Sequence, residues 1–101
     1  MSTLILIPTQ KEFDQFLNAC TTLGVVHQNS SLGRLPVVEL PQQNAVLAMG
    51  GLGKVQYAVH MQHLLTVKSS WGLAICLGAA CALDPKLNIG DVIVAISTVE
   101  H

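Results

Sequence analysis

The sequence predicts an α/β fold with a mixed, largely parallel sheet flanked by helices. Three continuous apolar runs, at residues 4–7, 45–49 and 72–77, have the length and composition of buried strands. Segments with apolar residues at helical spacing separate these runs, at residues 10–23 and 54–68. Alternation of apolar strands with helices is typical of a mainly parallel sheet that carries helices on its faces.

The first predicted helix has a start signal and an apolar face. Thr9, followed three residues later by Glu12, forms a capping-box pattern that satisfies free N–H groups at a helix start. Gly24 follows the last apolar position and is a typical helix end. The residues expected on the apolar face are Phe13, Phe16, Leu17, Cys20 and Leu23.

The segment after this helix is less regular and predicts an antiparallel hairpin. Gly33 and Arg34 lie between two short candidate strands, near residues 25–27 and 35–40. In the second helix we expect a broad buried face, which comprises Val55, Ala58, Val59, Met61, Leu64 and Leu65.

The last part of the chain predicts small residues at 78–83, a turn at 84–88 and a further strand at 92–96. A strand with no following element leaves sheet edge and sheet face uncovered. We therefore expect a truncated domain spanning residues 1–101, domain swapping, or tight association with other copies.

The composition excludes several classes of function. Half of the residues are hydrophobic and only 11% are charged, against about 25% in an average globular chain. Such a short chain buries little, so we expect apolar surface to meet another copy and predict a homo-oligomer. With a net charge of -1 and no basic run, nucleic-acid binding is not expected. No run reaches the roughly 18 apolar residues of a membrane span, so no membrane partner is expected.

The cysteines indicate a reducing compartment. The three cysteines include no CxxC pair, and the N-terminus lacks a signal-peptide pattern, so a cytoplasmic location is predicted. Cys76 lies in an apolar strand and is expected to be buried, whereas Cys81 is expected to be the most accessible cysteine. His60 and His63 share a helix face, but no third ligand is near in sequence, so no metal is expected.

The glycine-rich segment from Gly50 to Lys54 matches neither the phosphate-binding loop nor the G-x-G-x-x-G spacing. A dinucleotide-binding domain, which would also alternate strands with helices, is disfavoured by this spacing and by the lack of an acidic residue at the expected distance. We interpret the segment as a strand-to-helix turn that requires close packing.

Two motifs nevertheless resemble a known family. Gly50-Gly51-Leu52-Gly53-Lys54-Val55 resembles the Ser-Gly-Ile-Gly-Lys-Val segment of methylthioadenosine/S-adenosylhomocysteine nucleosidases. The block from Gly78 to Leu87, followed by Gly90-Asp91-Val92-Ile93-Val94, resembles their Gly-Ser-Ala-Gly-Gly-Leu…Leu-x-x-Gly-Asp signature. The order and spacing agree along the chain, which is similar to the N-terminal part of the purine nucleoside phosphorylase and nucleosidase superfamily.

The resemblance implies an α/β sandwich, usually oligomeric, that cleaves the bond between a purine and a ribose. The expected partner is a purine nucleoside or purine base, and no cofactor is expected. Nucleosidases use water as the nucleophile and phosphorylases use phosphate. The block that begins at Gly78 contains no arginine to hold phosphate, which favours hydrolysis, although phosphorolysis stays open.

The resemblance also implies site residues. By position, Glu12 is the glutamate that handles the water, and the substrate-binding residues are Gly78, Ala79, Ala80 and Cys81. Ala79 replaces the family serine, and Cys81 and Ala82 replace two glycines, which puts standard nucleosidase activity in doubt. Glu12 alternatively serves only its helix cap, and the two roles conflict because a carboxylate folded onto Thr9 is less free to hold water.

The family has two further requirements, and the resemblance places both after His101. One is the aspartate that helps to protonate the purine, and the other is the Met-Glu segment that grips the ribose. We therefore expect residues 1–101 alone to be inactive. The alternative is a non-catalytic paralogue that self-assembles or binds nucleosides.

Overall fold

In the computed structural model, which describes residues 2–97, five strands form one mixed sheet in the order β2-β3-β4-β1-β5. The elements along the chain are β1 (Ser2–Ile7), α1 (Gln10–Thr22), β2 (Gln28–Leu32), β3 (Leu35–Leu40), a short 3-10 helix (Pro41–Gln43), β4 (Ala45–Met49), α2 (Lys54–Val67) and β5 (Trp71–Cys76). Strand β1 is parallel to both β4 and β5, whereas β3 is antiparallel to β2 and β4. The predicted α/β class and the mixed sheet are confirmed.

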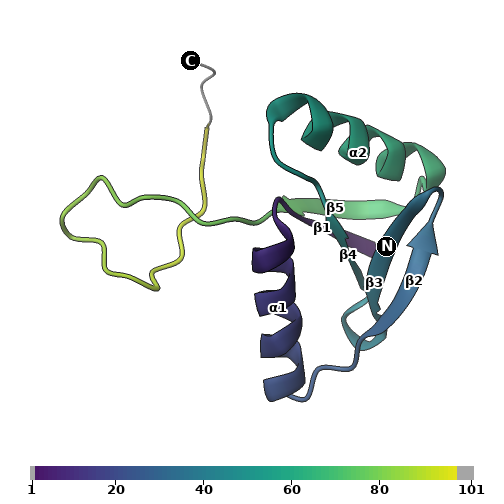
Figure 1. Ribbon diagram of the computed structural model, residues 1–101, viewed down its shortest axis with the longest axis horizontal. Coiled ribbons are helices and arrows are strands. Elements are labelled where there is room, and N and C mark those ends of the chain that lie inside the picture. Colours follow the sequence, from purple (N-terminus) through teal and green to yellow (C-terminus); the bar gives the residue numbers. More distant parts are fainter. Residues whose placement is uncertain (1, 98–101) are drawn as a thin grey trace.

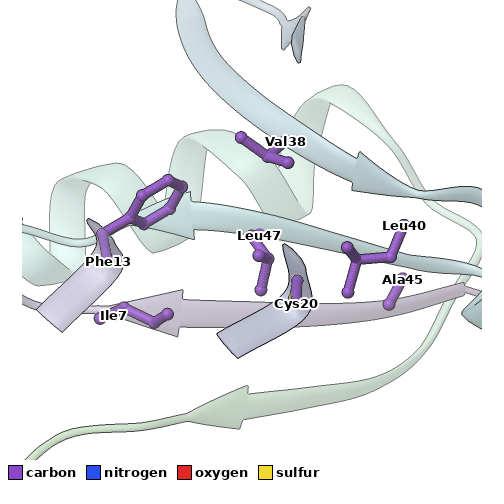
Figure 2. Close-up of a cluster of buried hydrophobic side chains, with 7 residues drawn as sticks. All are labelled: Ile7, Phe13, Cys20, Val38, Leu40, Ala45 and Leu47. Carbon is purple, nitrogen blue, oxygen red and sulfur yellow. The ribbon is translucent and has the colours of Figure 1, made fainter. Parts of the chain in front are cut away.

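Helix α1 covers one face of the sheet and α2 covers the other (Figure 1). The side chains of β1 alternate between the two layers, as a pleated strand requires. Ile7 belongs to the cluster under α1, whereas Leu4 and Leu6 belong to the cluster under α2. Figure 2 shows the cluster under α1, which consists of Ile7, Phe13, Cys20, Val38, Leu40, Ala45 and Leu47.

The predicted limits of α1 are confirmed in atomic detail. The Thr9 hydroxyl accepts from the Glu12 N–H at 3.2 Å and caps the helix start. At the end, Gly24 has a φ of 73°, and Val25 N–H donates to Cys20 O at 2.8 Å, which terminates the helix as a Schellman motif does. The apolar face is confirmed except at Leu23, which is the C-cap and is 78% exposed because it lies beyond the regular turns.

The predicted hairpin is confirmed, but its first strand is displaced. It spans Gln28–Leu32 and not residues 25–27. The two-residue turn at Gly33 and Arg34, with a φ of 59° at Gly33, sets the register in which Leu32 pairs with Leu35. Val25 instead packs against the cluster under α1, so it connects the helix to the hairpin.

The broad buried face predicted for α2 is wrong. Leu64 is fully buried and Met61 and Tyr57 pack beside it, at spacings of three and four residues. Val55 and Val59 are 79% and 48% exposed. A helix presents a single stripe to a flat sheet, so the apolar residues outside that stripe remain exposed. Ala58 and Leu65 are exposed for the same reason.

The third predicted strand forms as β5, but it is not buried. Among residues 2–97 it is an edge strand that pairs only with β1, and Leu73 is 56% exposed. The sequence run was apolar enough for a central strand, but an edge position leaves part of each face uncovered.

The strand predicted at residues 92–96 is also wrong. Residues 77–97 contain no helix or strand and extend away from the sheet (Figure 1). Val92, Ile93 and Ile96 are between 65% and 101% exposed. Their high β-propensity does not produce a strand here because no neighbouring backbone pairs with them. The predicted turn at residues 84–88 is confirmed by the bond from Leu87 N–H to Asp84 O, at 3.0 Å.

Candidate functional site

The carboxyl ends of the three parallel strands, β1, β4 and β5, lie side by side at one end of the sheet. Leu77 N–H donates to Leu6 O at 2.9 Å, which joins the end of β5 to β1. Gly50 N–H donates to Ile7 O at 2.9 Å, which joins the end of β4 to β1. In α/β sheets ligands bind at the carboxyl ends of the strands, because the loops that follow the strands converge there.

Glu12 lies on the first turn of α1, directly after the β1 end, and is half-buried. Its Oε1 accepts from the Thr9 hydroxyl at 2.6 Å, while its own N–H donates to the same hydroxyl oxygen. Thr9 therefore caps the helix as predicted, whereas the Glu12 side chain bonds to the Thr9 hydroxyl and not to the Thr9 N–H that a capping box would use. The short turn from Ile7 through Pro8 fixes this carboxylate beside the end of β1.

The other Glu12 oxygen reaches the loop after β5. Oε2 accepts from Ala79 N–H at 2.8 Å, across 67 residues of sequence. Gly78 lies between β5 and this contact, and a Cβ added at Gly78 would lie 3.6 Å from Oε2. Three of the residues that the sequence singled out, Glu12, Gly78 and Ala79, are thus brought together.

The structure does not bring the other two predicted residues to Glu12. Ala80 and Cys81 are exposed, and within residues 2–97 no hydrogen bond joins either of them to the carboxylate. They begin the segment that leaves the sheet. The predicted accessibility of Cys81 is confirmed, whereas the predicted burial of Cys76 is wrong, because the edge position of β5 leaves Cys76 exposed.

The segment after β4 is the strand-to-helix turn that its sequence predicted. It connects Met49 to the start of α2 at Lys54. Gly51 and Gly53 have φ angles of 91° and 86°, which residues other than glycine rarely adopt. A Cβ at Gly50 would lie 2.3 Å from the Tyr57 ring, so this turn is packed closely against α2.

Tyr57 is the residue at the carboxyl ends of the strands that sequence reasoning missed. Its hydroxyl donates to Leu6 O at 3.3 Å. Burial, and then a hydrogen bond and charge from Cys76, raise the pKa of Tyr57 well above its ordinary value. The spacing of Tyr57 from Met61 and Leu64 would have placed it on the buried stripe, but an aromatic residue at that spacing is usually only core.

The histidines and the arginine serve other contacts. His60 Nδ1 lies 3.2 Å from Met49 O, and His63 Nε2 accepts from Arg34 N–H at 3.0 Å. Arg34 lies at the β2–β3 turn, on the sheet edge opposite β5. The larger surface hollow, of about 500 Å³, is lined by Arg34 and the outer side of α2 and contains none of the Glu12 contacts. Because it is broadly open, we assign the site from the converging strand ends instead.

Metal ions and a membrane are two kinds of partner that the described residues address. Across residues 2–97, no set of three or more His, Cys, Asp or Glu side chains is arranged to hold a metal ion. Neither α1 nor α2 is long and apolar enough to cross a membrane.

The arrangement offers one carboxylate, of Glu12, and one main-chain donor, the Ala79 N–H, at the carboxyl ends of the strands. The lone pairs of the Glu12 carboxylate that the bonds from the Thr9 hydroxyl and the Ala79 N–H leave free can accept from a water. From such a position the carboxylate can orient a water and take up its proton.

A comparison with protein families matches residues 2–101 to the phosphorylase superfamily. No curated protein and no solved structure matched the chain. The match covers nearly the whole chain and confirms, at the level of the superfamily, the resemblance drawn from the glycine-containing motifs.

Proposed function

Because the chain belongs to the phosphorylase superfamily, we propose that it is the N-terminal segment of a purine nucleosidase. Its substrate would be a nucleoside like methylthioadenosine or S-adenosylhomocysteine. The observation that carries this proposal is the contact of Glu12 Oε2 with Ala79 N–H at the converging strand ends. This contact joins Glu12, the residue that would orient the water, to the loop of Gly78 and Ala79, which would bind the substrate.

In the proposed reaction, water attacks the ribose carbon as the bond from that carbon to the purine nitrogen breaks. Glu12 orients the water and takes one proton from it, and the departing purine acquires a proton on nitrogen. The products are the free purine and the ribose with a new hydroxyl. General-base assistance of this kind contributes roughly 10²- to 10⁴-fold.

Glu12 supplies only one half of this chemistry. Asp84 and Asp91 accept from main-chain N–H groups of their own turns, at 2.9 and 2.8 Å, so neither is a natural acid for the purine. We therefore assign the activity to a larger assembly that contains this segment, with the acid and the ribose-gripping group supplied outside residues 2–97. Cytoplasmic location and self-association remain predictions.

Water is favoured over phosphate as the nucleophile. Arg34, the only arginine, lies in the β2–β3 turn, at the same end of the sheet as the loop that contains Gly78 and Ala79, but β4 and β1 separate its hairpin from β5. Phosphate would need a cation at that loop. A dependence of turnover on added phosphate would reverse this choice in favour of phosphorolysis.

A non-catalytic role is the second candidate. Both oxygens of Glu12 already accept hydrogen bonds, from the Thr9 hydroxyl and from Ala79 N–H. Ala79 also has no hydroxyl to assist a water. These features favour a module that binds purines or assembles with itself without turnover.

The deciding experiment is Glu12→Gln in the protein that carries this segment, assayed for release of adenine from methylthioadenosine. We expect turnover to fall at least about 100-fold, because the amide cannot accept a proton. Asp14→Asn is the matched control, since Asp14 lies one half-turn away on α1, is exposed and bonds only to Gln10 within the described contacts. It should leave turnover unchanged.

Unchanged turnover in Glu12→Gln would remove the catalytic assignment and leave the cap alone. The non-catalytic candidate is tested with the 101-residue chain itself, by its native mass and by calorimetric titration with adenine and methylthioadenosine. A defined oligomer that ignores both compounds would favour an assembly module over a nucleoside site.

A further inference from the structure

The side chain of Tyr57 lies among the carboxyl ends of the three parallel strands. Its hydroxyl donates to Leu6 O in β1 at 3.3 Å, and Cys76, at the end of β5, contributes to the raised pKa of that hydroxyl. Its ring lies against Gly50, directly after β4, where an added Cβ would approach ring carbons to 2.3 Å. A single residue of α2 therefore holds together the strand ends that carry the candidate site.

The contact with Leu6 continues through the main chain to Glu12. Leu6 O accepts a second hydrogen bond from Leu77 N–H, at 2.9 Å, which uses the other lone pair of the carbonyl. Two residues further on, Ala79 N–H donates to Glu12 Oε2 at 2.8 Å. The position of the Leu6 carbonyl thus affects where the loop after β5 begins and where the Ala79 N–H points.

We infer that Tyr57 is a positioning residue, which sets the Ala79 amide against the Glu12 carboxylate through Leu6 and the end of β5. Its ring is half-buried between α2 and the sheet, which limits its movement. The Tyr57 hydroxyl has an ordinary pKa of 10.0 and is a donor at neutral pH, and burial raises that pKa further. The importance of this role for turnover rests on the proposed function, whereas its effect on the Ala79 amide does not.

The test is Tyr57→Phe, which keeps the ring against Gly50 and removes only the hydroxyl. Amide exchange at Ala79 is measured by NMR, together with the pH titration of the Ala79 amide shift, which reports ionisation of Glu12. We expect exchange at Ala79 to become about three- to tenfold faster, the factor that one net hydrogen bond represents. The amplitude of the titration should fall, because the amide no longer tracks the carboxylate closely.

Trp71→Phe is the matched control. Trp71 Nε1–H donates to Leu64 O at 3.0 Å, so this variant also removes one bond between α2 and the sheet, but at the start of β5 and not at the carboxyl ends of the strands. A change at Ala79 in Tyr57→Phe alone supports the positioning role. No change in Tyr57→Phe, or equal changes in both variants, would overturn it and leave general stability as the only effect.

These outcomes are separate from those of the proposed function. The amide measurements need no substrate, so they stand even if Glu12→Gln leaves turnover unchanged. Conversely, loss of turnover in Glu12→Gln with an unaffected Ala79 amide in Tyr57→Phe would keep the nucleosidase and reject the role of Tyr57.

Discussion

Helix α1 turns one apolar stripe to the sheet, whereas α2 carries apolar residues around most of its circumference. In α1, Phe13 and Cys20 are buried, and charged or polar residues such as Asp14 occupy the outer side. In α2, Leu64 is fully buried while Val55 is 79% exposed. Apolar spacing therefore identifies the buried face only where polar residues mark the opposite one.

The largest expected effect tests the claim that α2 is anchored by one stripe. Leu64→Ala should lower the free energy of unfolding by about 2–5 kcal/mol, because it leaves a cavity in a fully buried position. Val55→Ala on the same helix should change it by less than about 0.5 kcal/mol. Urea denaturation of both variants measures the difference, and similar losses would mean that α2 is packed on both sides.

A smaller effect tests how the two helices begin. Thr9 caps α1 with its hydroxyl, whereas α2 follows Gly53, which offers no side-chain cap. Thr9→Ala should therefore cost about 0.5–2 kcal/mol in unfolding free energy. Thr22→Ala, which removes a hydroxyl bonded to Asn18 O at the other end of α1, is the control. Equal costs from the two variants in thermal unfolding would argue against a specific cap.

The smallest effect concerns the α1 interior and depends on pH. Burial raises the pKa of the Cys20 thiol from 9.0, so the folded state favours the neutral form. Its contribution to stability is full below the ordinary thiol pKa and is lost as the pH rises through the folded value. The stability difference between the wild type and Cys20→Ala should thus be constant at pH 7–8 and shrink above pH 9. A difference independent of pH would mean that Cys20 is not desolvated.

The sequence was a good guide to local structure and a poor guide to burial. The positions of β1, β3, β4, β5 and the two helices, the α1 cap and the Gly33-Arg34 turn follow from local chemistry, and the structure confirms them. The first hairpin strand was displaced, and the strand predicted at residues 92–96 does not form. The apolar run of β5 gave no sign that it lies at an edge. That information depends on which neighbours a strand has, and single-residue composition does not record it.

The candidate site was predictable only in some of its members, and its contacts were not predictable. Glu12 and Gly78 could be singled out because motifs mark their positions. The Ala79 donor is a main-chain N–H, which any residue other than proline provides, so no residue type signals it. Tyr57 was missed because the same spacing equally describes an ordinary core aromatic.

The place of β1 in the sheet has a consequence for synthesis of the chain. Strand β1 is an inner strand that is synthesised before both of its partners, β4 and then β5, which ends at Cys76. At about 5–20 residues per second, roughly 4–14 s pass before both partners exist. During that interval an apolar N-terminal strand has no completed sheet to join. Factors that hold nascent chains would therefore be expected to act on β1.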